Sequence, residues 1–160
     1  MAAAVSASAG IVLFRRRPAG VDVLLGHMGG PFWARRDEGA WSIPKGELDV
    51  DEEPLTAARR EFSEELGSPA PDGPAIDLGE IRQSGGKRVR AWAIEGDLDV
   101  TAVVSGTFEL EWPPRSGRTA VFPEIDRAAW FELGTARTKV VSAQAELFDR
   151  LVRLLAHSEE

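Results

Sequence analysis

Short apolar runs separated by turn residues predict strands in the first two thirds of the chain. Ser8–Phe14 and Val21–Leu25 flank a turn rich in arginine, proline and glycine, which is typical of a hairpin. Ile76–Ile81 and Val89–Ile94 flank a second turn at Gln83–Lys87. We therefore expect two hairpins in this part of the chain.

A helical period of apolar residues begins near Asp51 and ends at Gly67. Pro54 suits a first helical turn, and glycine is a common residue just after a helix end. One stripe of this helix is expected to face a core: Leu55, Ala58, Phe62 and Leu66. A closing helix over Ala143–Ala156 is expected to turn three leucines inward: Leu147, Leu151 and Leu154.

The remaining segments are short or irregular. They are a loop at His27–Ala40, an extended piece at Trp41–Pro44, a proline and glycine loop at Trp112–Arg118, and a short strand at Ala129–Phe131. There is no internal repeat and no linker between two patterned regions. We therefore expect one domain over residues 1–160.

Composition and charge exclude several kinds of chemistry. Cysteine is absent, so disulfides, cysteine–zinc sites and a thiol nucleophile are excluded. The formal net charge of -7 argues against a stable nucleic-acid complex. The first residues do not resemble a signal peptide, and no apolar run approaches membrane-spanning length, so we expect a cytoplasmic protein without a membrane partner. The oligomeric state is not predicted.

Acidic side chains gather on one arc of the predicted helix. Glu61, Glu64 and Glu65 are neighbours there because helical residues three and four positions apart are adjacent. Arg60 is spaced to pair with Glu64. Like charges at this spacing repel, and carboxylate oxygens are the ligands that Mg²⁺ and Mn²⁺ prefer. A bound divalent cation explains the cluster, and a solvated helix face is the alternative.

A longer pattern around the helix favours the cation. Eight positions at fixed spacing resemble the Nudix box: Gly46, Glu52, Arg60, Glu61, Phe62, Glu64, Glu65 and Gly67. Ser68 departs from the pattern, since the family has a packed aliphatic residue there. The resemblance implies an α/β/α sandwich with a mixed central sheet. It also implies a hydrolase that uses Mg²⁺, or Mn²⁺ as a substitute, to cleave a phosphoanhydride bond in a nucleotide-like small molecule.

The resemblance further implies roles for individual residues. The metal ligands would be Glu61, Glu64 and Glu65, with help from Glu52. Arg60 would orient Glu61, and Glu61 and Glu64 would belong to the catalytic set. A general base is also required, either in the box or in a later loop. Glu124, six residues before Trp130, matches Nudix hydrolases of diadenosine polyphosphates; an ordinary exposed loop glutamate is the alternative.

Basic residues suggest where phosphates would bind. Ser42–Glu47 resembles the entry to the box in diadenosine polyphosphate hydrolases and in enzymes of diphosphoinositol phosphates. Lys45 in this segment would contact phosphate as a flexible point charge. Lys87 matches a basic position of the dinucleotide enzymes, although a basic strand edge is the alternative.

Aromatic residues suggest where a base would bind. The dinucleotide enzymes have a tyrosine where this chain has Ala91, so stacking would fall to Phe32 and Trp33. The tryptophans at strand positions are expected in the core: Trp41, Trp92 and Trp130. Arg115 and Arg118 would either hold distal phosphates or keep their loop soluble.

The sequence therefore leaves three functions open. The first is a dinucleoside polyphosphate hydrolase, favoured by Pro44–Gly46 and Glu124. The second is a nucleoside triphosphate pyrophosphatase that removes oxidised or surplus nucleotides. The third is a nucleotide-binding module without catalysis, which the complete set of box carboxylates argues against. His27 and His157 are isolated and do not discriminate among the three.

Overall fold

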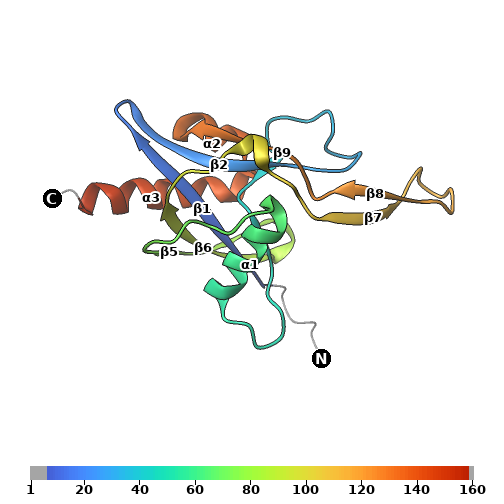
Figure 1. The fold of residues 1–160 in the computed structure, drawn as a ribbon, viewed down its shortest axis with the longest axis horizontal. Helices are drawn as coiled ribbons and strands as arrows, with labels where there is room; N and C mark the ends of the chain where they lie inside the picture. The colour runs from blue at the N-terminus through green and yellow to red at the C-terminus, as the bar shows by residue number, and fades with distance from the viewer. Residues whose placement is uncertain (1–6, 159–160) are drawn as a thin grey trace.

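The centre of the molecule is a seven-stranded mixed sheet in a computed structural model that describes residues 7–158 (Figure 1). Its strands are β1 (Ala7–Arg17), β2 (Gly20–Met28), β3 (Trp41–Ser42), β4 (Lys45–Glu47), β5 (Ile76–Arg82), β6 (Arg88–Glu95) and β9 (Ile125–Glu132). The order is β3-β2-β1-β6-β5, with β4 paired to β1 and β9 paired to β2. β1 and β6 are parallel, and the other pairs are antiparallel.

The other elements lie on or beside this sheet. They are α1 (Pro54–Leu66), α2 (Leu133–Lys139), α3 (Ala145–Ser158), the hairpin strands β7 (Thr107–Glu111) and β8 (Thr119–Pro123), and 3-10 turns at Ser84–Gly86, Val100–Ala102 and Ser142–Gln144. Among the described residues, no helix is long and apolar enough to span a membrane.

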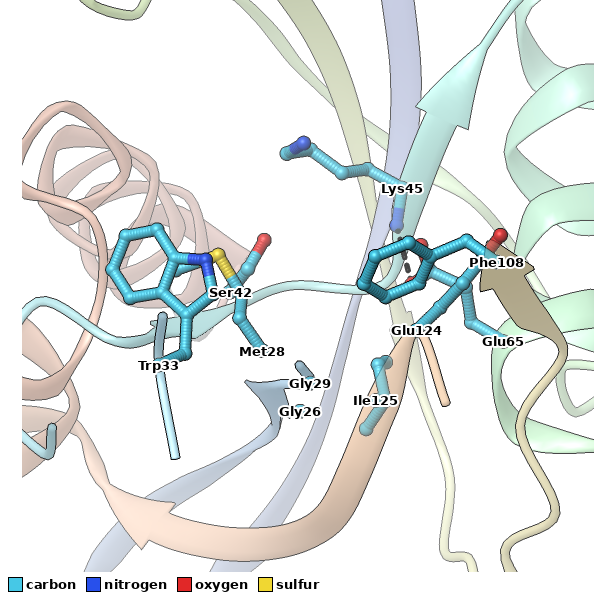
Figure 2. A pocket seen from close by; sticks show the side chains of 10 residues that line it. All are labelled: Gly26, Met28, Gly29, Trp33, Ser42, Lys45, Glu65, Phe108, Glu124 and Ile125. Atoms are coloured by element: carbon cyan, nitrogen blue, oxygen red, sulfur yellow. Dashed lines mark hydrogen bonds between the residues drawn. The ribbon is translucent and has the colours of Figure 1, made fainter. Parts of the chain in front are cut away.

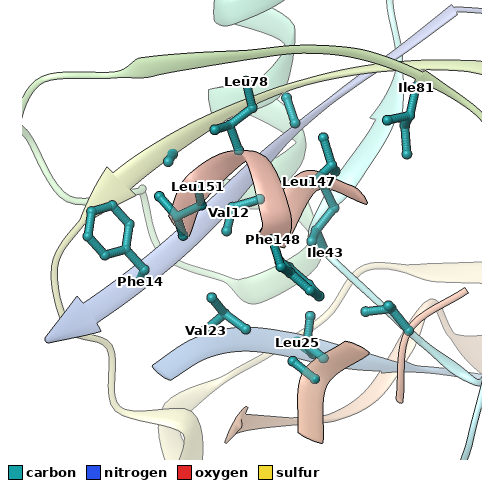
Figure 3. Packing of buried hydrophobic residues seen from close by; sticks show 14 of the residues in the cluster. Val12, Phe14, Val23, Leu25, Ile43, Leu78, Ile81, Leu147, Phe148 and Leu151 are labelled. Carbon is teal, nitrogen blue, oxygen red and sulfur yellow. The ribbon is translucent and has the colours of Figure 1, made fainter. Parts of the chain in front are cut away.

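Helices cover both faces of the sheet. On one face, α1 buries Phe62 and Leu66 against Ile11 and Leu13 of β1. On the other face, α3 packs against the opposite side of β1 and against β2 (Figure 3). That cluster includes Val12, Phe14, Val23, Leu25, Leu147, Phe148 and Leu151. Successive β1 residues therefore point to opposite helical layers. The predicted α/β/α sandwich with a mixed sheet is confirmed.

The helix boundaries and phases differ from the predictions in two places. α1 begins at Pro54 rather than near Asp51, because Asp51 has a φ of 61° that a helix does not accommodate. Its predicted end is confirmed, since Gly67 is a left-handed cap with a φ of 81°. In α3 the prediction for Leu154 was wrong: it is 38% exposed, and Leu155 continues the buried stripe one turn after Leu151.

The predicted loop at Trp112–Arg118 is the tip of a hairpin that the sequence analysis did not predict. β7 pairs with β8 from Thr107 opposite Pro123 to Glu111 opposite Thr119. The hairpin projects away from the body of the sheet (Figure 1). β8 leads directly into β9, which is longer than the predicted strand at Ala129–Phe131. The short helix α2 was also not predicted.

The predicted core tryptophans divide into two groups. Trp41 and Trp92 are buried, as expected. Trp130 is only partly buried, and the guanidinium of Arg15 lies 4.1 Å from its ring centroid. Trp130 therefore lies at the edge of the core, where a cation can cover its outer face.

Candidate active site

Strand β4 and helix α1 meet so closely that one box position must be glycine. A Cβ built on Gly46 would lie 2.0 Å from the carboxyl carbon of Glu61. The carboxyl group of Glu61 therefore occupies the space that any other residue at position 46 would need. This contact explains why the pattern begins with glycine and why its helix follows at a fixed distance.

Arg60 connects the box carboxylates. Its Nη1 donates to Glu61 at 2.9 Å and to Glu64 at 3.2 Å, as the helical spacing predicts for the latter pair. Its Nε and Nη2 donate to the two oxygens of Glu52, each at 2.9 Å. Nη2 also donates to the carbonyl of Glu47 at 3.0 Å. Arg60 therefore ties α1 to the segment that precedes it and holds Glu61 in one orientation.

Glu52 is fully engaged by these contacts. Its Oε1 also accepts the backbone N–H of Asp49 at 3.0 Å. Arg60, followed by this N–H, lowers the pKa of Glu52 to about 2. Glu52 supports Arg60 in this arrangement, because both of its carboxylate oxygens are already hydrogen-bonded.

Glu65 is the most enclosed carboxyl group of the site. It accepts the backbone N–H of Lys45 at 3.2 Å (Figure 2). Burial raises the pKa of Glu65 to about 8, although Lys45 opposes the shift. Burial also raises the pKa of Glu61, against the opposing effect of Arg60. Glu64 is different, since its side chain is 55% exposed.

The connection between β8 and β9 brings Glu124 to the box. Its backbone N–H donates to the carbonyl of Gly106, and its own carbonyl accepts the N–H of Gly29, both at 2.9 Å. The charge of Glu124 contributes to the raised pKa values of Glu61 and Glu65. The carboxyl groups of Glu61 and Glu65 on α1 therefore lie in the same region as the carboxyl group of Glu124, which comes from a distant part of the chain. These three groups cannot balance one another's charge.

Lys45 lies close to Lys87 and also close to Glu61 and Glu65. The two lysines come from β4 and from the residue just before β6. Burial, followed by repulsion from Lys87, lowers the pKa of Lys45. The two cations therefore lie close enough to bind neighbouring oxygens of one anion.

A pocket of about 300 Å³ is lined in part by Glu65 and Glu124 (Figure 2). Trp33 and Phe108 stand on opposite sides of it. Its other lining residues are Gly26, Met28, Gly29, Ser42, Lys45 and Ile125. Phe32, the second predicted stacking residue, is not part of this lining. It is 60% exposed and contacts the ring of Trp112 at a centroid distance of 5.5 Å.

Phe108 was missed by the sequence analysis, although a signal for it exists. Residues Thr107–Glu111 alternate between polar and apolar types before a turn-rich loop, and the apolar run Ala120–Phe122 follows that loop. Two strands around this loop would form a hairpin with Phe108 and Phe122 on the same face, and the structure places these residues opposite each other. The hairpin in turn returns the chain to Glu124.

Neither histidine belongs to the group of side chains around the pocket. His27 is fully buried, with Nδ1 2.9 Å from Asp126 and Nε2 2.7 Å from the carbonyl of Arg36. His157 is exposed near the end of α3. Neither side chain lines the pocket.

The acidic residues fit a divalent cation that is only partly held by protein. Within residues 7–158, no three carboxylate or imidazole groups converge tightly enough to enclose an ion. Glu61 and Glu65 nevertheless bear buried carboxyl groups whose charge Arg60 and Lys45 balance incompletely. All the donors are oxygens. Mg²⁺ suits such a site because it keeps several waters and shares phosphate oxygens with a substrate.

Comparison with known proteins identifies the fold and the family. A model of the NUDIX domain matches residues 5–151. No curated protein sequence matches the chain. Among solved structures, an Ap4A hydrolase from C. elegans in a binary complex has a TM-score of 0.66 at 21% identity, with 96% of this chain and 99% of that chain covered.

Two further structures show the same fold at low identity. The NUDIX domain of Shewanella oneidensis NrtR, complexed with ADP ribose, has a TM-score of 0.65 at 16% identity and covers 96% of this chain and 90% of that one. A mutT/nudix family protein from Listeria innocua has a TM-score of 0.62 at 17% identity, with 96% of each chain covered. Together with the complete box, the family match establishes that this chain belongs to the NUDIX domain family and is a hydrolase of pyrophosphate bonds.

Proposed function

We propose that this hydrolase uses Mg²⁺ to cleave a dinucleoside polyphosphate, with diadenosine tetraphosphate as the leading candidate. The observation behind the proposal is that Glu124 lies close to Glu61 and Glu65, and that Lys45, with Lys87 next to it, lies close to the same two carboxyl groups. Such an arrangement suits a chain of phosphates, because it offers both cations for the phosphate oxygens and a general base. The similar fold of the C. elegans Ap4A hydrolase supports the same substrate class.

Glu61, Glu64 and Glu65 are the residues that would hold Mg²⁺, or Mn²⁺ in its place. When bound, the ion neutralises phosphate oxygens and makes a coordinated water more acidic. Arg60 keeps the carboxylate of Glu61 oriented, at 2.9 Å. We assign Glu52 to the support of Arg60 rather than to direct ligation, because both of its oxygens are bonded to Arg60.

The other side chains bind substrate and move a proton. Lys45 and Lys87 bind phosphate oxygens next to the carboxylates. Glu124 accepts a proton from the attacking water, since it is an exposed carboxylate at the edge of the pocket. Trp33 and Phe108 hold a base between the two sides of the pocket.

The pocket volume supports a second candidate substrate, a nucleoside triphosphate. At about 300 Å³ the pocket is at the small end of ligand sites and would hold one nucleoside. A triphosphate pyrophosphatase would need no further surface. In both cases we propose a cytoplasmic enzyme acting on a small-molecule nucleotide, without a stable nucleic-acid complex, in keeping with the net charge of -7.

One experiment separates these candidates. The protein is incubated with Mg²⁺ and, separately, with diadenosine polyphosphates, nucleoside triphosphates, ADP-ribose and diphosphoinositol phosphates, and the products are identified. We expect the fastest turnover with a diadenosine polyphosphate. A clear preference for triphosphates would favour the pyrophosphatase. Absence of turnover with every compound would contradict both.

A variant tests the role of the carboxylates. Glu64→Gln changes a half-exposed side chain, so the fold should survive, while kcat should fall by about a hundredfold or more. Glu109→Gln on β7 removes an equal charge at an exposed position outside the pocket and should leave kcat unchanged. Near-normal turnover of Glu64→Gln would remove Glu64 from the metal site.

A further inference from the structure

Several arginines in two segments that also line the pocket form no ion pair with another described residue, although the chain has a net charge of -7. Elsewhere in the described residues, most arginine side chains form ion pairs, as Arg15 does with Asp22 and Arg90 with Asp77. Apart from Arg59 and Arg82, the arginines within residues 7–158 that form no ion pair come from two segments. They are Arg35 and Arg36 of the β2–β3 loop, and Arg115 and Arg118 of the β7–β8 tip.

Asp37 could neutralise one of these arginines, but its carboxylate is hydrogen-bonded to other residues. Asp37 follows Arg36 in the chain, yet it accepts hydrogen bonds from Nζ of Lys139 and from Nε1 of Trp41. Arg36 instead lies over the ring of Trp33, with its guanidinium carbon 5.6 Å from the centroid. None of the ion pairs within residues 7–158 involves these four arginines, although Glu38 and Glu111 lie in or beside the same two segments, so their positive charge can still be neutralised by a ligand from outside the chain.

An aromatic contact joins the two segments into one surface. Phe32 of the β2–β3 loop meets Trp112 at the hairpin tip edge to face, with ring centroids 5.5 Å apart. Trp112 and Arg118 are themselves linked across the tip by a backbone hydrogen bond of 2.9 Å. We call this region the tip surface and define it as Phe32, Arg35, Arg36, Trp112, Arg115 and Arg118. The hairpin and the loop that form it project from the same side of the molecule (Figure 1).

The tip surface continues the pocket outward. Trp33, which lines the pocket, follows Phe32 directly. Phe108 of β7, on the other side of the pocket, lies four residues before Trp112, which directly follows the end of that strand. At a rise of about 3.3 Å per residue, the tip is about 13 Å beyond Phe108. A ligand that fills the pocket with one nucleoside and extends past it therefore meets the tip surface.

We propose that the tip surface binds the outer phosphates of a polyphosphate substrate together with the base at its far end. This inference rests on the proposed function, since it needs a substrate longer than the pocket. Guanidinium groups match phosphate oxygens in charge and in the geometry of their paired N–H donors. Phe32 is 60% exposed and offers an aromatic face on which a base can stack.

Binding to the metal-free protein isolates this surface. Without an ion, the carboxylates of the pocket repel phosphates, so the arginines should supply a larger share of the affinity for a polyphosphate than they do in the presence of Mg²⁺. Titration calorimetry in chelator at low ionic strength compares inorganic tripolyphosphate with diadenosine tetraphosphate. The double variant Arg115→Ala/Arg118→Ala should raise the Kd of both ligands by about tenfold or more.

A charge-matched control distinguishes a site from general attraction. Arg137→Ala/Arg153→Ala removes the same charge from exposed positions on α2 and α3 and should change each Kd by less than about twofold. Equal affinities in all three proteins would overturn the proposal, as would an equal loss in the control.

Phe32→Leu tests the place of the base. Leucine keeps an apolar side chain against Trp112 but removes the aromatic face. The Kd of diadenosine tetraphosphate should rise about tenfold, whereas that of tripolyphosphate should stay the same. An unchanged Kd for both ligands would overturn the assignment of the base to Phe32.

Steady-state kinetics separates a failure of this inference from a failure of the proposed function. With Mg²⁺, the arginine double variant should raise KM for diadenosine tetraphosphate and leave kcat and the KM of ATP unchanged. If no dinucleotide is hydrolysed but tripolyphosphate still binds through the arginines, the proposed function fails and the anion site stands. If the dinucleotide is hydrolysed with an unchanged KM and binding is also unchanged, the inference fails alone.

Discussion

Gly46 has no side chain, so the carboxyl group of Glu61 can occupy the space beside it. A substitution that adds one methyl group at position 46 tests whether this placement is needed. In Gly46→Ala the new Cβ would lie 2.0 Å from the carboxyl carbon of Glu61, so one of them must move. Because a displacement of about 1 Å can cost about a hundredfold in rate, we expect kcat to fall by at least that factor. The measurement is turnover at saturating Mg²⁺, with circular dichroism to verify the fold.

Gly106→Ala is the matched control for this substitution. A Cβ at Gly106 would lie 3.5 Å from the carbonyl of Glu64, which is an ordinary contact, although Gly106 borders the same site. Turnover of this variant should stay near that of the wild type. Wild-type activity in Gly46→Ala would mean that the observed position of Glu61 is not needed for catalysis.

Residues within one local pattern were the ones that sequence could place. The pairing of Arg60 with Glu64 follows from helical spacing, and both contacts at 3.2 Å agree with it. The choice between Phe32 and Phe108 as a pocket residue could not be made in this way. It depends on how a hairpin folds back over a loop more than seventy positions earlier in the chain, which no local period records.

At the scale of elements, the long helix α1 was predicted more accurately than the short pieces. A stripe over thirteen residues and a glycine cap define its end at Gly67. β7 and β8 have five residues each, and only β7 alternates between polar and apolar types, a pattern too brief to distinguish a strand from an exposed loop without knowledge of the pairing. α3 was recognised, but its phase drifted by one residue at Leu154 because a three-residue and a four-residue step are both helical.

A buried histidine holds the β2–β3 loop against the sheet, so removing its partner should lower the stability of the protein. His27 at the end of β2 is fully buried between Asp126 of β9 and the carbonyl of Arg36 in the loop. Asp126→Asn removes the charged acceptor from this ring. We expect the free energy of unfolding to fall by about 1–3 kcal/mol, as for other buried polar groups that lose a partner. Urea denaturation measures the change.

Asp149→Asn provides the comparison on an exposed pair. Asp149 of α3 pairs with Arg137 of α2, and both side chains are more than two fifths exposed. Surface pairs of this kind contribute little, so this variant should unfold close to the wild type. An equal loss of stability in the two variants would show that His27 does not depend on Asp126 for its burial.

For the whole molecule, the family pattern predicted the layers but not the order of the strands. The apolar run in β1 is buried on both faces, which agrees with a central strand between two helical layers. The parallel pairing of β1 with β6 joins segments that begin some eighty residues apart. That pairing places Lys87 near Lys45, and it arises from packing of the complete sheet rather than from any local signal.

The net charge of -7 and the enclosed carboxyl groups predict a link between pH, metal and stability. Burial raises the pKa of Glu65 to about 8 from an ordinary value of 4.5. Between these pH values the folded protein keeps a proton that the unfolded chain has released. The metal-free protein should therefore lose stability as pH rises through this window, by up to about 1.4 kcal/mol per pH unit from this group. Above the folded pKa the full penalty is present.

Mg²⁺ should reverse that loss, because it binds the ionised carboxylates and competes with the proton. Urea denaturation in chelator at about pH 6 and about pH 9 should show lower stability at the higher pH, and added Mg²⁺ should stabilise the protein more at the higher pH. Glu65→Gln removes the titrating group and should flatten both differences. Parallel pH profiles of the wild type and Glu65→Gln would contradict the link, since the pH dependence would then come from other groups.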